Sequence, residues 1–191
     1  MKNRCVWCQN TFEQYVRYHD EEWGVPVHDD QTHFEFLTLE SAQAGLSWST
    51  ILKKRDGYRK AFADFEVREV ARFDEKKIQQ LLNNSAIVRN KLKIRSAVNN
   101  ARQYIEIQKA FGSFDNYIWS FVDGEPIQNH WENHGDIPAT TPLSDRFSKD
   151  LKKRGFKFVG STTMYAHLQA CGLVNDHLVS CFRHAEVKSM A

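Results

Sequence analysis

The side chain least expected in its setting is Glu40, which lies in a stretch that should form a helix. On a helix its face is shared by the residues three and four positions away: Phe36, Leu37, Gln43 and Ala44. That face is mostly apolar, so the carboxylate should point inward. A buried carboxylate is costly unless it is paired, hydrogen-bonded or held for chemistry. Glu40 is therefore either a satisfied core residue of a helical hairpin or a candidate catalytic group.

The turn after Glu40 adds two further side chains of interest. The helix should break at Gly45, and Ser47 is a suitable N-cap for a second helix that begins at Trp48. The short joint would then place the apolar side chain of Leu46 at the tip of a sharp turn. The inward carboxylate of Glu40, the exposed side chain of Leu46 and the indole of Trp48 thus lie within nine residues of one another.

Metal-binding side chains occur at both ends of the chain. His177 and Cys181 are four residues apart, so on a helix they lie one above the other, in the geometry of zinc ligands. The N-terminal segment supplies Cys5 and His19. Two sulfurs and two imidazoles would make a closed tetrahedral structural site that joins the two termini. A lone pair with this spacing is more often an ordinary helix face, and the matching N-terminal pair is what favours the metal.

Composition indicates a single helical domain that spans residues 1–191. The 191 residues are 41% hydrophobic and 13% aromatic, enough for a sizeable core. No apolar run approaches a membrane span, and the N-terminus has no signal peptide, so we expect a cytoplasmic protein. Four cysteines in a reducing compartment indicate metal ligands or buried thiols rather than disulfides. The net charge of +2 permits nucleic-acid binding without requiring it.

A glycine-flanked link between two helices is predicted near the C-terminus. We expect one helix from Ser144 to Arg154, the link GFKFVG, and a second helix that starts at Ser161 and closes at Gly172. A helix, hairpin and helix over about 144–172 is a nucleic-acid-binding motif, because glycines let backbone N–H groups approach a phosphate. Basic side chains crowd this region, including Lys153 and Lys157.

The remaining segments are expected to form further helices and one surface loop. An N-terminal helix should carry Tyr15, Tyr18 and His19, with Trp7 before it and Trp23 after it. Residues 62–114 predict three helices, broken near 73–74 and 83–85. The charged residues of 89–102 are all basic and form either a solvated face or a phosphate contact. The polar stretch 123–141 looks like a surface loop, and the sequence assigns no chemistry to it.

Several long motifs resemble those of bacterial 3-methyladenine DNA glycosylase I, a branch of the helix-hairpin-helix glycosylases. They are YHDEEWGVP (18–26), LESAQAGLSW (39–48) followed by ILKKR, WSFV (119–122), LKKRGFKFVG (151–160) and QACGLVNDH (169–177). The resemblance covers nearly the whole chain. It implies an all-α helix-hairpin-helix fold, one structural Zn²⁺, and removal of N3-methyladenine from double-stranded alkylated DNA. The implied products are free 3-methyladenine and an abasic site.

The resemblance also assigns roles to residues. It makes Glu40 the catalytic, base-reading group. The other implied roles are substrate binding by Tyr18, Trp48, Trp7, Tyr15 and Trp23; DNA binding by Gly45, Leu46, Lys153, Gly155, Lys157 and Gly160; and zinc binding by Cys5, His19, His177 and Cys181. The family branch works without the catalytic acid that many relatives place after the hairpin, so Asp176 is expected to be structural, for instance at the metal end. Lys157 is the one lysine near the hairpin that could act as a nucleophile, and phosphate contact is its simpler role.

Some alternatives stay open. Cys8 makes a Cys-x-x-Cys pair with Cys5 and either is a bystander thiol or competes with His19 for the metal. A non-catalytic DNA-binding module would explain the basic and metal-binding residues but not the inward Glu40. A zinc hydrolase would need an open coordination position, which two cysteines and two histidines do not leave. Nothing in the sequence indicates an oligomer, so a monomer is expected.

Overall fold

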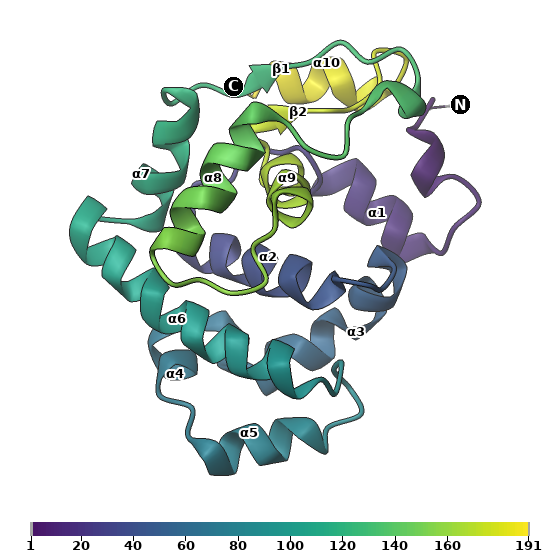
Figure 1. The fold of residues 1–191 in the computed structure, drawn as a ribbon. Helices are drawn as coiled ribbons and strands as arrows, with labels where there is room; N and C mark the ends of the chain where they lie inside the picture. Colours follow the sequence, from purple (N-terminus) through teal and green to yellow (C-terminus); the bar gives the residue numbers. More distant parts are fainter. Residues whose placement is uncertain (1, 191) are drawn as a thin grey trace.

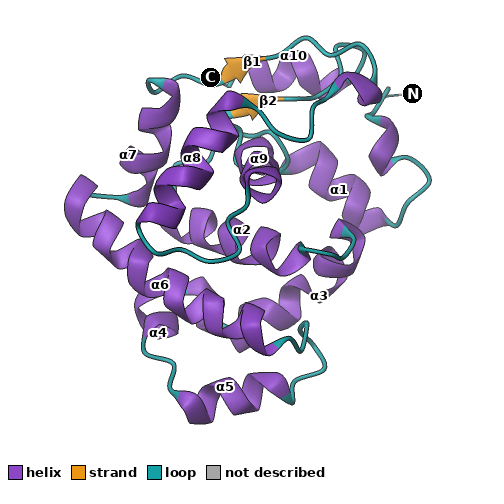
Figure 2. Cartoon of the chain, viewed as in Figure 1, coloured by secondary structure: helices purple, strands orange, loops and turns teal. Residues whose placement is uncertain are grey.

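The computed structural model describes residues 2–190 and is mostly helical (Figures 1 and 2). In chain order the helices are α1 (Glu13–Glu21), α2 (Asp30–Gln43), α3 (Trp48–Ala61), α4 (Val67–Ala71), α5 (Glu75–Leu82), α6 (Lys91–Phe111), α7 (Phe114–Trp119), α8 (Pro142–Lys153), α9 (Ser161–Ala170) and α10 (Phe182–Lys188). Short 3₁₀ turns occur at Val6–Cys8, Ala63–Phe65, Ser120–Val122 and His134–Asp136. The three helices predicted between residues 62 and 114 are confirmed as α4, α5 and α6.

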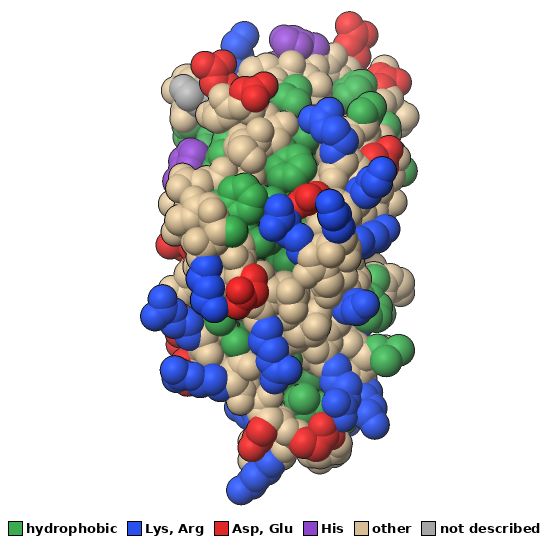
Figure 3. All heavy atoms as spheres, turned by 60° about the vertical axis from the view of Figure 1, so that its left-hand side comes forward, with side chains coloured by type: hydrophobic (Ala, Val, Ile, Leu, Met, Phe, Trp, Pro, Cys, Tyr) green, Lys and Arg blue, Asp and Glu red, His purple; other side chains and the backbone are tan. Residues whose placement is uncertain are grey.

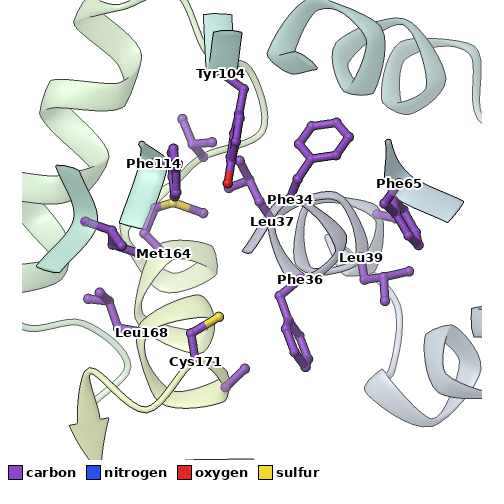
Figure 4. Packing of buried hydrophobic residues seen from close by; sticks show 14 of the residues in the cluster. Phe34, Phe36, Leu37, Leu39, Phe65, Tyr104, Phe114, Met164, Leu168 and Cys171 are labelled. Carbon is purple, nitrogen blue, oxygen red and sulfur yellow. The ribbon is translucent and has the colours of Figure 1, made fainter. Parts of the chain in front are cut away.

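Helix α2 is the central element of the core. Every residue from His33 to Ala42 is buried, so this helix has no solvent-facing side over that range. A helix buried all round must be enclosed by other elements, and α3, α6, α7 and α9 pack around it. Figure 4 shows its Phe34, Phe36, Leu37 and Leu39 side chains radiating toward these neighbours. Because α2 is held on all sides, its polar residues have fixed positions.

Local capping sets both ends of α2, and the break at Gly45 and the N-cap at Ser47 are as predicted. The Asp29 carboxylate accepts a hydrogen bond from the backbone N–H of Thr32 at 2.7 Å. At the other end, Gly45 has φ of +77°, a conformation that favours glycine. The Ser47 hydroxyl then accepts a hydrogen bond from the N–H of Thr50 and begins α3. The α2–α3 turn therefore leaves Leu46 exposed at its tip.

Helices α8 and α9 are joined by a short link that packs on α6. The link leaves α8 through Gly155, whose φ is +90°. Asn100 of α6 holds it with two hydrogen bonds: its Oδ1 accepts from the N–H of Lys157 at 2.8 Å, and its Nδ2 donates to the Lys157 carbonyl at 2.9 Å. One predicted boundary is wrong: α8 begins at Pro142, and its N-cap is Thr141 rather than Ser144. Ser144 is the third helical residue and bonds back to Thr141 in a capping box.

Two other predictions need correction. The fold is mostly helical rather than strictly all-α, because β1 (Ile127–Gln128) pairs in parallel with β2 (Val174–Asn175). The segment with His177 and Cys181 is a turn between β2 and α10, not a helix. The Asp176 carboxylate, which accepts four side-chain hydrogen bonds from outside this segment, holds it in place.

Among residues 2–190, none of the helices is both long and apolar enough to cross a membrane.

Candidate functional site

A cavity of about 310 Å³ opens between α1, α2, α3 and α9. Its size is that of a small-molecule pocket. Its wall consists of Trp7, Tyr15, Tyr18, Trp23, Glu40, Gln43, Trp48, His134, Ile137, Ala166 and Gln169. The catalytic residue and all five substrate-binding residues predicted from the sequence are in this set, so the fold brings together side chains that are up to 41 positions apart in the chain.

Aromatic rings form one side of the cavity. The ring of Trp7 lies 5.4 Å from that of Tyr15 and 5.0 Å from that of Trp23, measured between centroids. Tyr18 and Trp48 are 5.3 Å apart and come from α1 and α3. These rings meet at tilted or edge-on angles, which leaves faces available to a flat ligand. Such faces attract cations as well as other rings.

Glu40 faces the cavity from α2 and is almost completely buried, with 4% of its surface exposed. Burial disfavours the charged form and raises its pKa to about 8. Its Oε2 atom has no hydrogen-bond partner in residues 2–190, and the same is true of Nε1 of Trp48. Buried polar atoms are normally paired. An acceptor and a donor that both lack partners in one cavity indicate a site that a polar ligand completes.

Five residues of the wall were not predicted. Gln43 could have been found, because it follows Glu40 by three positions on the same helix face. His134 and Ile137 belong to the loop to which the sequence assigned no chemistry. No local sequence pattern predicts that this loop lies against the cavity, because it reaches the cavity through tertiary contacts. The remaining two, Ala166 and Gln169, lie on α9.

Asp176 connects that loop to the cavity. Its carboxylate accepts hydrogen bonds from Asn129 and the indole N–H of Trp131, which precede the part of the loop at the cavity. It also accepts hydrogen bonds from the hydroxyl of Tyr165 and from Gln169, both on α9. These four donors use both carboxylate oxygens. Asp176 itself is absent from the cavity wall.

A second hollow, of about 190 Å³, adjoins the cavity. It shares Glu40 and Gln43 with the cavity and reaches the α2–α3 turn with Leu46, opposite Thr162 and Thr163 of α9. Leu46 is 41% exposed. The ammonium group of Lys93 donates hydrogen bonds to the Ala42 and Ala44 carbonyls at the end of α2. The turn therefore presents an apolar side chain from a braced backbone.

The four predicted metal ligands lie together in a buried cluster. Sγ of Cys181 is 3.5 Å from Nε2 of His19 and 3.7 Å from Nδ1 of His177, and Sγ of Cys5 is 3.6 Å from the same Nδ1. With zinc–sulfur and zinc–nitrogen bonds of about 2.3 and 2.0 Å, the edges of a tetrahedral site are about 3.5 Å long. The cluster therefore has the dimensions of a four-coordinate metal site.

The outer nitrogens of both histidines are also held. Nδ1 of His19 lies 2.8 Å from a carboxylate oxygen of Asp20, and Nε2 of His177 lies 2.9 Å from the carbonyl of Trp23. Partners of this kind orient ligating imidazoles. Cys8 is not in the cluster; its thiol donates to the Cys5 carbonyl. The geometry thus brings His19, not Cys8, to the other three residues.

The predicted basic residues of the α8–α9 link are exposed. Lys153 and Lys157 both reach solvent beside Gly155. Gly160 is the N-cap of α9 and has an ordinary φ of −61°, so its backbone does not require glycine. A Cβ atom there would meet open space. Figure 3 shows Lys and Arg side chains spread over one face of the molecule, and on α8 Arg146, Lys149 and Lys153 line a shallow hollow.

The basic run of 89–102 is largely committed within the protein. Lys93 braces the α2–α3 turn, Arg95 pairs with Glu75, and Arg102 donates to the Ala71 carbonyl. These three side chains are therefore held by contacts within the protein, whereas Arg89 and Lys91 are exposed.

Comparison with known proteins adds independent findings. The family model "Methyladenine glycosylase" matches residues 7–184. DNA-3-methyladenine glycosylase 1 of Escherichia coli is 45% identical over 178 residues, covering 93% of this chain and 95% of the relative. The solved structure of 3-methyladenine DNA glycosylase I from Staphylococcus aureus, described as the structural basis of 3-methyladenine recognition, has a TM-score of 0.91 and 40% identity. It covers 95% of this chain and 96% of its own.

A further solved structure is that of a variant of 3-methyladenine DNA glycosylase I in complex with 3-methyladenine. Its TM-score is 0.91 at 39% identity, with 94% of this chain and 96% of that chain covered.

Proposed function

The chain belongs to the methyladenine glycosylase family, and we propose that the cavity around Glu40 is the site where it binds and releases a flipped N3-methyladenine base. The protein is a DNA-3-methyladenine glycosylase of base-excision repair that acts on alkylated DNA. The bond between the base and C1′ of the sugar breaks, and water supplies the hydroxyl group at C1′. The products are free 3-methyladenine and an abasic site.

The assignment of the site depends on two buried polar atoms, Oε2 of Glu40 and Nε1 of Trp48, which face one cavity without partners. An adenine derivative carries an exocyclic amine that can donate to a carboxylate, and a guanine presents the acceptor O6 instead. Ionised Glu40 accepts hydrogen bonds but cannot donate them. The site therefore suits an adenine-type edge and disfavours a guanine-type edge.

The charge of the substrate explains how the site acts with few catalytic groups. Methylation at N3 gives the base in DNA a positive charge and weakens its bond to the sugar, so the leaving group arrives activated. The faces of Trp48 and Tyr18 attract this cation by about 0.5–2 kcal/mol per desolvated contact. The cation also favours ionised Glu40, whose proton leaves as the base enters. Neutral adenine offers no such charge attraction.

The exposed elements around the cavity are placed to hold the duplex open. The target base must leave the stack before it can enter the cavity. We assign Gly45 and Leu46 to the wedge that fills the vacated space, because Leu46 is exposed on a braced turn beside the cavity. We assign the α8–α9 link, as a helix-hairpin-helix motif, to the phosphate backbone, through Gly155, Gly160, Lys153 and Lys157.

We assign one structural Zn²⁺ to Cys5, His19, His177 and Cys181. The distances between these ligands and the partners of the two histidines support a closed tetrahedral site. When bound, the ion would join the N-terminal segment to the turn before α10. This connection would hold Trp7 and Tyr18 at the cavity, because Trp7 follows Cys5 by two residues and Tyr18 directly precedes His19. Because the set is closed, the metal has a structural role here.

We further propose that residues 1–191 act as one domain and as a monomer in the cytoplasm. The cavity, the wedge and the link all come from one chain, so no second copy is needed to complete the site. Glu40 has no neighbouring lysine on the cavity wall that could form a covalent adduct with the sugar. The enzyme is therefore assigned as monofunctional, without strand cleavage.

The test is incubation of the purified protein with methylated duplex DNA, followed by chromatography and mass analysis of the released bases. Release of 3-methyladenine, with the DNA strand intact until alkali is added, supports the assignment. Salt-sensitive DNA binding without any released base would make the protein a DNA-binding module. Strand cleavage without alkali would overturn the monofunctional assignment.

A further inference from the structure

We propose that His33, His167 and Cys171 form a second, buried metal site, for a thiophilic ion with copper(I) preferred. The three side chains come from α2 and α9, on the buried interface between these helices. Each is buried, and one ligand atom from each lies within 4.8 Å of the other two. None of the three lines the cavity of the candidate active site.

The distances within this cluster suit a three-coordinate site. Sγ of Cys171 lies 3.8 Å from Nε2 and 3.9 Å from Nδ1 of His167. A trigonal ion with metal–sulfur and metal–nitrogen bonds of about 2.3 and 2.0 Å needs a sulfur–nitrogen separation of about 3.7 Å. The ring centroids of His33 and His167 are 6.0 Å apart. Because the sulfur is nearly equidistant from the two nitrogens of His167, that ring must rotate to direct one lone pair at a shared ion, while the three ligand atoms already lie within 4.8 Å of one another.

The histidines of the cluster lack satisfactory partners. Nδ1 of His33 has no hydrogen-bond partner in the described part of the chain, and Nε2 has only a long contact of 3.4 Å with the Asp115 carboxylate, although the residue has no exposed surface. The ring nitrogens of His167 have only the long contacts to the Cys171 sulfur. A buried polar group left unpaired costs about 1–3 kcal/mol. A metal ion would use a lone pair from each ring and remove part of this cost.

The side chains that pack against the two histidines are mostly apolar. Phe114 and Phe147 lie 5.7 and 6.2 Å from the rings of His33 and His167, respectively. Figure 4 shows Cys171 and Met164 at the interface of α9 with its neighbours, among apolar side chains. His167 and Cys171 have no exposed surface, so the cluster lies in an environment that excludes water.

An acidic residue connects the cluster to the surface. Oδ1 of Asp115 lies 3.4 Å from Nε2 of His33 and 3.1 Å from Nδ1 of His28. A carboxylate against a ligating histidine is the usual arrangement that orients such a ring. The side chain of His28 is 58% exposed. The Asp115 carboxylate therefore lies between the exposed His28 and the buried His33.

The ligand set decides the kind of ion. Zinc almost always takes four ligands in structural sites, as the cluster of Cys5, His19, His177 and Cys181 provides. The second cluster offers two imidazoles and one thiolate, and a soft thiolate in a small set favours copper(I). On binding, the Cys171 thiol releases its proton to solvent, one metal–sulfur and two metal–nitrogen bonds form, and no electron is transferred.

The experiment uses the full chain with its zinc bound, incubated anaerobically with copper(I) or, separately, with added Zn²⁺. After gel filtration, copper and zinc per chain are measured by mass spectrometry. The expected result is one copper per chain with the original zinc retained. Cys171→Ser and His33→Leu should lose the copper and keep the zinc. Asp115→Asn should weaken copper binding by about tenfold or more.

The matched control is Cys8→Ser, which also removes a buried thiol but lies outside the second cluster. It should bind copper as the wild type does. Thermal unfolding provides an independent readout, because copper should raise the Tm of the wild type but not that of His33→Leu. Without copper, His33→Leu should have a Tm close to that of wild type, because it removes an Nδ1 that has no partner in residues 2–190 and an Nε2 whose contact with Asp115 is long.

Three results would overturn the proposal. One is the absence of any second ion in the wild type, and another is copper retained by both Cys171→Ser and His33→Leu. The third is copper uptake matched by an equal loss of zinc, which would place the copper in the cluster of Cys5, His19, His177 and Cys181. Uptake of a second zinc in place of copper, lost in Cys171→Ser, would confirm the site and overturn the preference for copper.

Discussion

Glu40 at the end of α2 and Trp48 at the start of α3 face the same cavity from either side of the Leu46 turn, and each keeps one buried polar atom unpaired. The two residues are connected by a turn whose backbone Lys93 braces. The cavity wall and the proposed wedge are therefore one continuous piece of chain. When Leu46 enters a duplex, the cavity for the flipped base would therefore lie beside the same base step.

The raised pKa of Glu40 predicts a pH-dependent stability. The unfolded chain loses the Glu40 proton near pH 4.5, whereas the folded protein keeps it to about pH 8. This contribution to stability is fully present below pH 4.5, falls as the pH rises through this window, and is constant above it. The fall is at most about 1.4 kcal/mol per pH unit.

Glu40→Gln removes this titration. Urea unfolding of both proteins between pH 5 and 9, without DNA, should show the variant gaining stability relative to wild type up to about pH 8. A stability difference that does not change with pH would show that Glu40 is ionised in the free enzyme.

The proposed wedge makes a separate prediction. Leu46→Ala should slow release of 3-methyladenine from duplex DNA by roughly tenfold, because unstacking a base step costs a few kcal/mol that the wedge offsets. Release from methylated single strands should change little, since no stack has to be replaced. Thermal unfolding should also be unchanged, because Leu46 is 41% exposed. Equal slowing on both substrates would contradict the wedge role.

Capping residues and helix periodicity were enough to predict several helix bounds and the burial of Glu40. Gly45 and Ser47 set the end of α2 and the start of α3 through backbone conformation and a local hydrogen bond, and their residue types signal this directly. The inward direction of Glu40 followed from its apolar neighbours and is confirmed by its burial.

Other features depend on contacts between distant segments. The two-residue pairing of β1 with β2 is too short to leave a periodic signal. His134 reaches the cavity because Asp176 anchors the preceding part of its loop. The cluster of His33 with His167 joins residues of two helices far apart in the chain, and neither has a distinctive local pattern. Such features require the packed structure.

The metal assignment predicts different outcomes for two neighbouring residues. His19→Ala should lose the zinc and destabilise the protein by about 4 kcal/mol or more, as removal of a structural metal does. Cys8→Ser should keep one zinc per chain, because its thiol lies outside the cluster. Metal analysis and urea unfolding check both variants. Full zinc content in His19→Ala would instead favour the Cys5–Cys8 pair.

The lysines of the α8–α9 link should affect DNA affinity rather than the choice of base. Each neutralised phosphate contributes about 0.9 to the slope of log K against log salt concentration. Lys153→Ala and Lys157→Ala should each reduce this slope by about that amount, and the double variant by twice as much. Fluorescence anisotropy with unmethylated duplex DNA measures it. Lys109→Ala, an exposed lysine on α6 that pairs with Glu106, is the matched control.

The most direct test of the central claim is the single-turnover rate of 3-methyladenine release from duplex DNA by Glu40→Gln. The loss of a charge-assisted hydrogen bond of about 1.5–3 kcal/mol predicts a rate about 10–100-fold below wild type. Zinc content should be unchanged, and Glu21→Gln, at an exposed position, should behave as wild type. A Glu40→Gln rate within twofold of wild type would contradict the role of Glu40 and the electrostatic basis of base selection.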